Sequence, residues 1–92
     1  MILALDVGNT NIVMGVIEGE KLRFQSRLST RLDKTAAEYA VLIKSILELH
    51  GADPRAFEGG IISSVVPPLT HKLRETLQLL TGKRPLVVGP GL

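Results

Sequence analysis

The sequence predicts an α/β domain with a mixed five-stranded sheet, topology βββαβαβ, and strand order 3-2-1-4-5 when the strands are numbered along the chain. Two observations support this prediction. Three short apolar segments separated by turns occupy residues 1–28, and two segments of helical periodicity, each with a short apolar run beside it, occupy the remainder. A meander of three strands followed by two right-handed crossovers gives that order, with the first strand at the centre.

The first two expected strands are short apolar runs joined by a polar turn. Ile2–Leu5 has the composition of a strand buried on both faces, and Ile12–Ile17 forms a second run. The segment Asp6–Asn11 is polar and short, which is typical of a tight turn. Gly8 and Asn9 are residue types that adopt positive φ at low cost, so we predict a hairpin.

The third expected strand follows a glycine turn at residues 18–20. Lys21–Leu28 alternates strictly, with basic or amide side chains on one face. A basic outer face is typical of an exposed edge strand, because charge discourages edge-to-edge association. The other face is expected to hold Leu22, Phe24, Ser26 and Leu28.

The first expected helix begins with a capping box, Thr35-x-x-Glu38. Gly51 is expected to end it. The residues that follow the capping box at helical spacing are Tyr39, Leu42, Ile43, Ile46, Leu47 and His50.

The second crossover is expected to run from a buried strand at Ile61–Val66 through a helix that begins at Pro67-Pro68, where proline fits the first turn. Gly82 is expected to close this helix, and Pro85–Val88 is the last predicted strand. Gly89-Pro90-Gly91 is expected to be a turn or linker. The buried face of the helix should carry Leu69, Leu73, Leu77 and Leu80.

Composition excludes several classes of function. The net charge of +2 and the scattered basic residues argue against a nucleic-acid or membrane partner. The absence of cysteine excludes disulfides and thiolate zinc sites. No apolar run approaches the roughly 18 residues of a membrane span, and Asp6 lies where a signal peptide would be apolar. We therefore expect a cytoplasmic protein.

The polar turn is also the candidate binding site. A hairpin of this kind directs several backbone N–H groups into one concavity, which favours an anion. Asp6 is badly placed to bind an anion directly but could hold a hydrated Mg²⁺ that the anion also binds. With the hydroxyl of Thr10, these groups predict a nucleotide-phosphate site. A hairpin that binds nothing, with Asp6 as a turn cap, is the competing interpretation.

The predicted topology adds a second pair of candidate residues. The first and fourth strands are expected to be parallel neighbours whose crossovers diverge, which is a topological switch point. Ligands of such sheets bind beyond the carboxyl ends of the strands at that point. The turn Asp6–Asn11 and the pair Ser63-Ser64 lie at those two strand ends. The serines are either lining residues of a cleft or a packed pair of small residues.

The segment Asp6-x-Gly8-Asn9-Thr10-Asn11 behind an N-terminal apolar strand resembles the first phosphate motif of the type III pantothenate kinases. That family belongs to the actin-like ATPase (ribonuclease H-like) superfamily, with the sugar kinases and acetate kinase. Further matches follow in the family's order and cover essentially the whole chain: Ser29-Thr30-Arg31, Thr35–Tyr39, Ile62–Pro67 and Val88–Gly91.

The resemblance implies ATP-dependent phosphorylation of pantothenate to 4'-phosphopantothenate, the first step of coenzyme A synthesis. It implies that Asp6 positions Mg²⁺, through water, and that the N–H groups of Gly8–Asn11 and the Thr10 hydroxyl meet phosphate oxygens. It also implies a monovalent cation, potassium or ammonium, bound outside this chain, and a homodimer of the complete protein. The implied ATP-phosphate residues are Asp6, Val7, Gly8, Asn9, Thr10, Asn11, Ile12 and Val13.

The chain departs from the family in length. Members have two similar domains, and their general base is an aspartate in a Gly-x-Asp-Arg motif of the second half. That motif does not occur here, since Asp33 and Asp53 precede Lys34 and Pro54, so the general base is expected beyond Leu92. We therefore expect residues 1–92 to be one domain, the phosphate-binding N-terminal half, without a catalytic base and inactive alone, from a truncated chain or a partial gene product.

Two alternatives remain open. The chain could be half of another actin-like or sugar kinase, although the Ser-Ser-Val-Val-Pro and Ser-Thr-Arg segments favour one family. It could also be a non-catalytic nucleotide-binding or regulatory module that keeps the fold.

Overall fold

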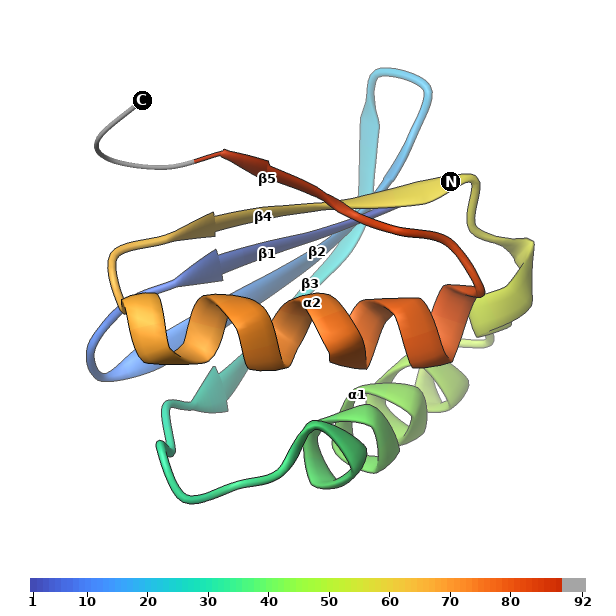
Figure 1. Cartoon of the computed structure of the whole chain (residues 1–92). Helices are drawn as coiled ribbons and strands as arrows, with labels where there is room; N and C mark the ends of the chain where they lie inside the picture. Colours follow the sequence, from blue (N-terminus) through green and yellow to red (C-terminus); the bar gives the residue numbers. More distant parts are fainter. Residues whose placement is uncertain (89–92) are drawn as a thin grey trace.

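The computed structural model describes residues 1–88. The predicted Gly89-Pro90-Gly91 turn lies outside them, as does Leu92, beyond which the general base is expected. The predicted sheet is confirmed: the strand order is β3-β2-β1-β4-β5, with β1 at the centre (Figure 1). β1 pairs antiparallel with β2 and parallel with β4. The elements are β1 (Ile2–Val7), β2 (Asn11–Glu18), β3 (Lys21–Ser29), α1 (Ala36–Leu49), the short 3-10 helix η1 (Pro54–Ala56), β4 (Gly59–Ser64), α2 (Pro67–Thr81) and β5 (Leu86–Val88).

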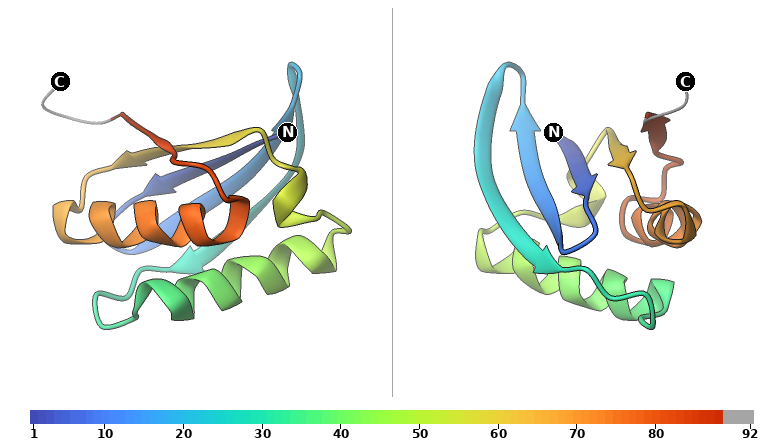
Figure 2. Two further views of the ribbon diagram at one scale, coloured as in Figure 1. Left: turned by 45° about the vertical axis from the view of Figure 1, so that its right-hand side comes forward. Right: turned by 90° about the vertical axis from the view of Figure 1, so that its left-hand side faces the viewer.

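Both helices lie on the same face of the sheet (Figure 2). Successive side chains of a strand point to opposite faces, and in β1 the residues facing the helices, Leu3, Leu5 and Val7, are at most 2% exposed. Neither α1 nor α2 covers the other face. Side chains of Ile2, Ala4 and Asp6 therefore project from the open face of the sheet, where Asp6 is exposed.

β1 is longer than the sequence predicted. The expected turn Asp6–Asn11 is wrong at both ends, since Asp6 and Val7 pair with β2 and β4, and Asn11 begins β2. A charged residue is tolerated inside this central strand because its side chain lies on the open face. Only Gly8, Asn9 and Thr10 link the two strands.

β3 is the predicted edge strand, but its alternation is broken by an irregularity. Val16 pairs with Phe24, whereas Ile17 pairs with Leu22, which leaves Arg23 as an extra residue. Because a bulge shifts the side-chain period, Leu22 does not share a face with Phe24, and it is 56% exposed. The expectation that these two residues lie on one face is wrong.

α1 begins as predicted. Glu38 N–H donates to Thr35 Oγ1 over 3.1 Å, and Thr35 N–H donates to Glu38 Oε1 over 2.8 Å, which completes the capping box. The hydrogen bond from the Thr35 N–H, and after it one from the Thr35 side chain, hold the pKa of the Glu38 carboxyl below its usual value. His50 is the C-cap of α1, and its ring stacks on Phe24 with centroids 4.0 Å apart.

Removal of this cap gives a first prediction. Thr35→Ala should lower the free energy of unfolding by roughly 0.5–2 kcal/mol, because the Glu38 N–H loses its acceptor. Urea denaturation followed by circular dichroism measures the change, and Thr35→Ser, which keeps the hydroxyl, is the matched control. An unchanged midpoint for Thr35→Ala would mean that the helix begins elsewhere.

β4 starts before the predicted position and packs directly on α2. A Cβ atom at Gly60 would lie 2.9 Å from Leu77 Cδ1 and 3.2 Å from the Leu3 carbonyl oxygen, so glycine lets β4 approach both α2 and β1 closely. Phe57, just before β4, is fully buried. The predicted buried face of α2 is confirmed at Leu69, Leu73, Leu77 and Leu80. Within residues 1–88, no helix is long and apolar enough to cross a membrane.

Candidate functional site

Gly8, Asn9 and Thr10 form the loop between β1 and β2, hereafter the hairpin loop. Gly8 N–H donates to the Asn11 carbonyl over 2.9 Å, and a Cβ atom on Gly8 would lie 3.2 Å from the same oxygen. The predicted positive φ is wrong here: within residues 1–88, only Gly19, Gly51 and Gly82 have it. A side chain at residue 8 would instead crowd the Asn11 carbonyl oxygen, which the tight turn brings close to it.

The tip of the hairpin loop presents free donors. Asn9 and Thr10 are exposed, and their N–H groups donate to no acceptor within residues 1–88. The N–H of Gly8 donates to the Asn11 carbonyl and closes the turn, so in this structure it is already engaged. The hairpin loop can therefore offer an anion the N–H groups of Asn9 and Thr10 and the Thr10 hydroxyl.

Asp6 precedes the hairpin loop on the open face of the sheet. Its Cα partners are Val13 on β2 and Ser63 on β4, so these three side chains form one row across the sheet. An exposed carboxylate next to a loop with free N–H donors is a suitable position for a hydrated divalent cation. Val7 and Ile12 are 1% and 0% exposed and face the helices, so only their backbone could contact a ligand.

The structure separates the two predicted serines. Ser63 lies beside Asp6 in the row on the open face, where it could line a site. Ser64 turns the chain into α2: its Oγ accepts from Val66 N–H over 3.0 Å and donates to the Val66 carbonyl over 3.2 Å. Val65 N–H bonds the Val7 carbonyl over 3.1 Å and so ties this turn to the end of β1.

The chain leaves β1 and β4 in opposite directions, as predicted. Only the connection after β4 is a crossover, which corrects the expectation of a crossover after each strand. β1 is followed by the hairpin to β2, and β4 is followed by α2, which leads to β5 on the other side. The correction does not move the predicted site, because the carboxyl ends of β1 and β4 still lie side by side at this point.

Sequence reasoning from the residues did not find the segment after β3 that holds the hairpin loop. Thr30 Oγ1 donates to the Gly8 carbonyl over 2.7 Å, and Thr30 N–H donates to the Thr10 carbonyl over 2.9 Å. Its neighbour Arg31 is bound to the buried Tyr39 hydroxyl of α1 through both backbone groups. The only signal for this segment was the family resemblance of Ser29-Thr30-Arg31.

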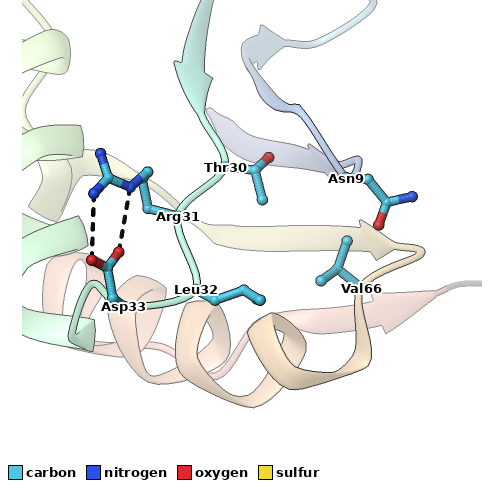
Figure 3. Close-up of a pocket in the computed structure, with 6 residues that line it drawn as sticks. All are labelled: Asn9, Thr30, Arg31, Leu32, Asp33 and Val66. Carbon is cyan, nitrogen blue, oxygen red and sulfur yellow. Dashed lines mark hydrogen bonds and ion pairs between the residues drawn. The ribbon is translucent and has the colours of Figure 1, made fainter.

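A pocket of about 450 Å³ lies beside the hairpin loop (Figure 3). Arg31 and Asp33 form an exposed ion pair at its rim, with 3.3 Å between Nε and Oδ1. The hydrogen bond and charge of Arg31 hold the pKa of the Asp33 carboxyl below its usual value. Asp6 and Ser63 do not line this pocket. Its lining residues are Asn9, Thr30, Arg31, Leu32, Asp33 and Val66.

Comparison with solved structures identifies the fold. The ROK hexokinase from Thermus thermophilus superposes with a TM-score of 0.69 and 19% sequence identity, over 96% of this chain and 33% of that chain. The expected actin-like ATPase fold is thereby confirmed.

Comparison of sequences identifies the family. The family described as type III pantothenate kinase matches residues 2–92. Proteins named type III pantothenate kinase from Geobacter sulfurreducens, Exiguobacterium sp. and Moorella thermoacetica are 48%, 46% and 41% identical over 92 residues. The chain spans 36% of the length of each of these relatives. The chain belongs to the type III pantothenate kinase family.

Proposed function

We propose that this chain is the phosphate-binding domain, the N-terminal half, of an enzyme that phosphorylates pantothenate with ATP. Transfer of the γ-phosphoryl group to the alcohol of pantothenate would give 4'-phosphopantothenate, the first step of coenzyme A synthesis. The observation that carries the proposal is the hairpin loop with Asp6 before it, in a chain whose residues 2–92 match the family.

The chain's own groups suit the phosphates of ATP. Phosphate oxygens would accept from the N–H groups of Asn9 and Thr10 and from the Thr10 hydroxyl. Both residues are exposed and lie next to each other in one loop. Asp6 would hold a hydrated Mg²⁺, which neutralises charge on the phosphates when it is bound. Phosphoryl transfer depends mainly on such positioning and charge neutralisation.

Other parts of the proposal rest on the family resemblance. The general base would lie beyond Leu92, in a Gly-x-Asp-Arg motif that this chain does not contain. The monovalent cation, potassium or ammonium, would bind outside residues 1–92, and the complete protein would be a cytoplasmic homodimer. The chain spans 36% of the length of the Geobacter sulfurreducens relative, and these features would belong to the complete protein.

A chimera tests the proposal. This chain replaces the matching 92 residues of the Geobacter sulfurreducens relative, with which it is 48% identical. We expect pantothenate-dependent ADP release from ATP by the chimera and none by the 92-residue chain alone. The unmodified relative is the positive control.

The two proteins separate the alternatives. Turnover by the isolated chain would contradict its assignment as a half that lacks the base. A folded chimera that binds ATP but phosphorylates nothing would favour the non-catalytic binding module. A chimera that phosphorylates a sugar instead would favour another kinase of the superfamily.

A further inference from the structure

We propose that Thr30 is a positioning residue that orients the Asn9 N–H, one of the proposed phosphate-binding donors of the hairpin loop. This inference deepens the proposed function and rests on it. Thr30 follows β3 and is far from the hairpin loop in sequence, yet it binds both ends of that loop. Its hydroxyl donates to the Gly8 carbonyl over 2.7 Å, and its N–H donates to the Thr10 carbonyl over 2.9 Å.

The two hydrogen bonds differ in kind. Asn11 and Ser29 are the last paired residues of β2 and β3, so the bond from Thr30 N–H to the Thr10 carbonyl extends the pairing of those strands by one step. The bond from the Thr30 hydroxyl crosses to the strand-β1 end of the loop and is not part of any ladder. It depends on a donor in the side chain of residue 30, which the threonine hydroxyl supplies.

The Thr30 hydroxyl controls the direction of the Asn9 N–H, a proposed hydrogen-bond donor to phosphate. The Gly8 carbonyl and the Asn9 N–H belong to one planar peptide unit, in which they point in opposite directions. Fixing the Gly8 carbonyl on Thr30 therefore fixes the Asn9 N–H on the opposite side, away from Thr30. That N–H is one of the exposed donors that bond no group within residues 1–88.

Thr30 is itself held by the core. Tyr39 is fully buried, and its hydroxyl accepts from Arg31 N–H over 2.9 Å and donates to the Arg31 carbonyl over 2.7 Å. The ring of Tyr39 is anchored on α1, so the segment after β3 cannot shift without breaking two hydrogen bonds. The hairpin loop is thus connected to the core of the domain through Arg31 and Thr30.

The decisive variant is Thr30→Val, which is nearly isosteric and keeps the bond from the backbone N–H to Thr10. In the 92-residue chain we expect lower NMR order parameters for the Asn9 and Thr10 amides. Because one ordinary hydrogen bond is lost, we also expect about three- to tenfold weaker binding of MgATP in a calorimetric titration. Thr30→Ser restores the hydroxyl and should restore both values.

A matched control separates positioning from general stability. Thr76 is fully buried on α2, and its hydroxyl donates to the Ala36 and Lys72 carbonyls over 3.1 and 2.9 Å. Thr76→Val should destabilise the fold but leave the order of the hairpin loop and the affinity for MgATP unchanged. Tyr39→Phe keeps the ring and removes both bonds to Arg31, so it should act in the same direction as Thr30→Val.

The outcomes are distinct. Wild-type order parameters at Asn9 and Thr10 in both Thr30→Val and Tyr39→Phe would overturn the inference. If Thr30→Val does not fold, the order parameters of Tyr39→Phe decide the matter. Equal effects of Thr30→Val and Thr30→Ser would also overturn it. If neither the wild-type chain nor the chimera binds MgATP, the proposed function fails, while the order parameters still decide whether Thr30 orients the loop.

Discussion

Asp6→Asn in the chimera is expected to lower kcat by on the order of a hundredfold or more, with less than a tenfold change in the affinity for ATP. The carboxylate would hold the hydrated metal that neutralises the phosphates. This neutralisation matters more as negative charge develops on the leaving group, so its loss falls on the transition state rather than on the bound nucleotide.

The fold should survive this change. Asp6 is exposed on the open face of the sheet, and its Cα neighbours there are Val13 and Ser63, so no buried charge is left unpaired. Asparagine also keeps the size of the side chain. Circular dichroism should show the wild-type spectrum.

Asp33→Asn is the matched control. It removes another exposed carboxylate in the same region, one that pairs with Arg31 and does not share the row on the open face. We expect near wild-type turnover for this variant in steady-state assays with pantothenate and ATP. Near wild-type turnover of Asp6→Asn would leave the hairpin as a mere connection between strands and remove the physical support for a kinase site.

The architecture could be predicted from the sequence because local patterns and topology rules agree. The apolar runs predict the strands. The capping box at Thr35 and Glu38 predicts α1, and the spacing of the leucines predicts α2. Right-handed crossovers after a three-stranded meander then favour the observed strand order. The errors are local: the irregularity at Arg23 changes the face of Leu22, and no alternation rule signals where a bulge will fall.

The candidate site was predicted less completely than the fold. Asp6, Asn9 and Thr10 are exposed near the predicted strand ends, because strand ends and turns can be recognised in a sequence. Thr30 could not be found in this way, since its role depends on which carbonyl its hydroxyl meets across the sheet. The Gly8 N–H bonds the Asn11 carbonyl, and the Ser64 hydroxyl bonds Val66. These hydrogen bonds likewise depend on the final geometry of two turns.

Gly8→Val is expected to weaken MgATP binding by about tenfold to a hundredfold, because the donors of the hairpin loop are displaced from the phosphates. A Cβ atom at this position would lie 3.2 Å from the Asn11 carbonyl oxygen, which already accepts from Gly8 N–H over 2.9 Å. A branched side chain must push that oxygen away. The peptide unit that carries the Asn9 N–H would then turn, and the bond from Thr30 to the Gly8 carbonyl would lengthen.

Gly19→Val is the control that separates crowding from backbone strain. Gly19 lies in the turn between β2 and β3 with φ of 61°, and nothing lies within 4 Å of a Cβ atom there. Valine at Gly19 should therefore cost about 1–3 kcal/mol of stability through strain, without any change in affinity for MgATP. Gly8 has the opposite properties, because its position is crowded but its φ is not positive. Calorimetric titration should therefore show a larger loss of affinity for Gly8→Val than for Gly19→Val. The affinity of Gly8→Ala should lie between those of Gly8→Val and the wild type. Wild-type affinity of a folded Gly8→Val chain would mean that close approach at Gly8 is not what holds the donors in place.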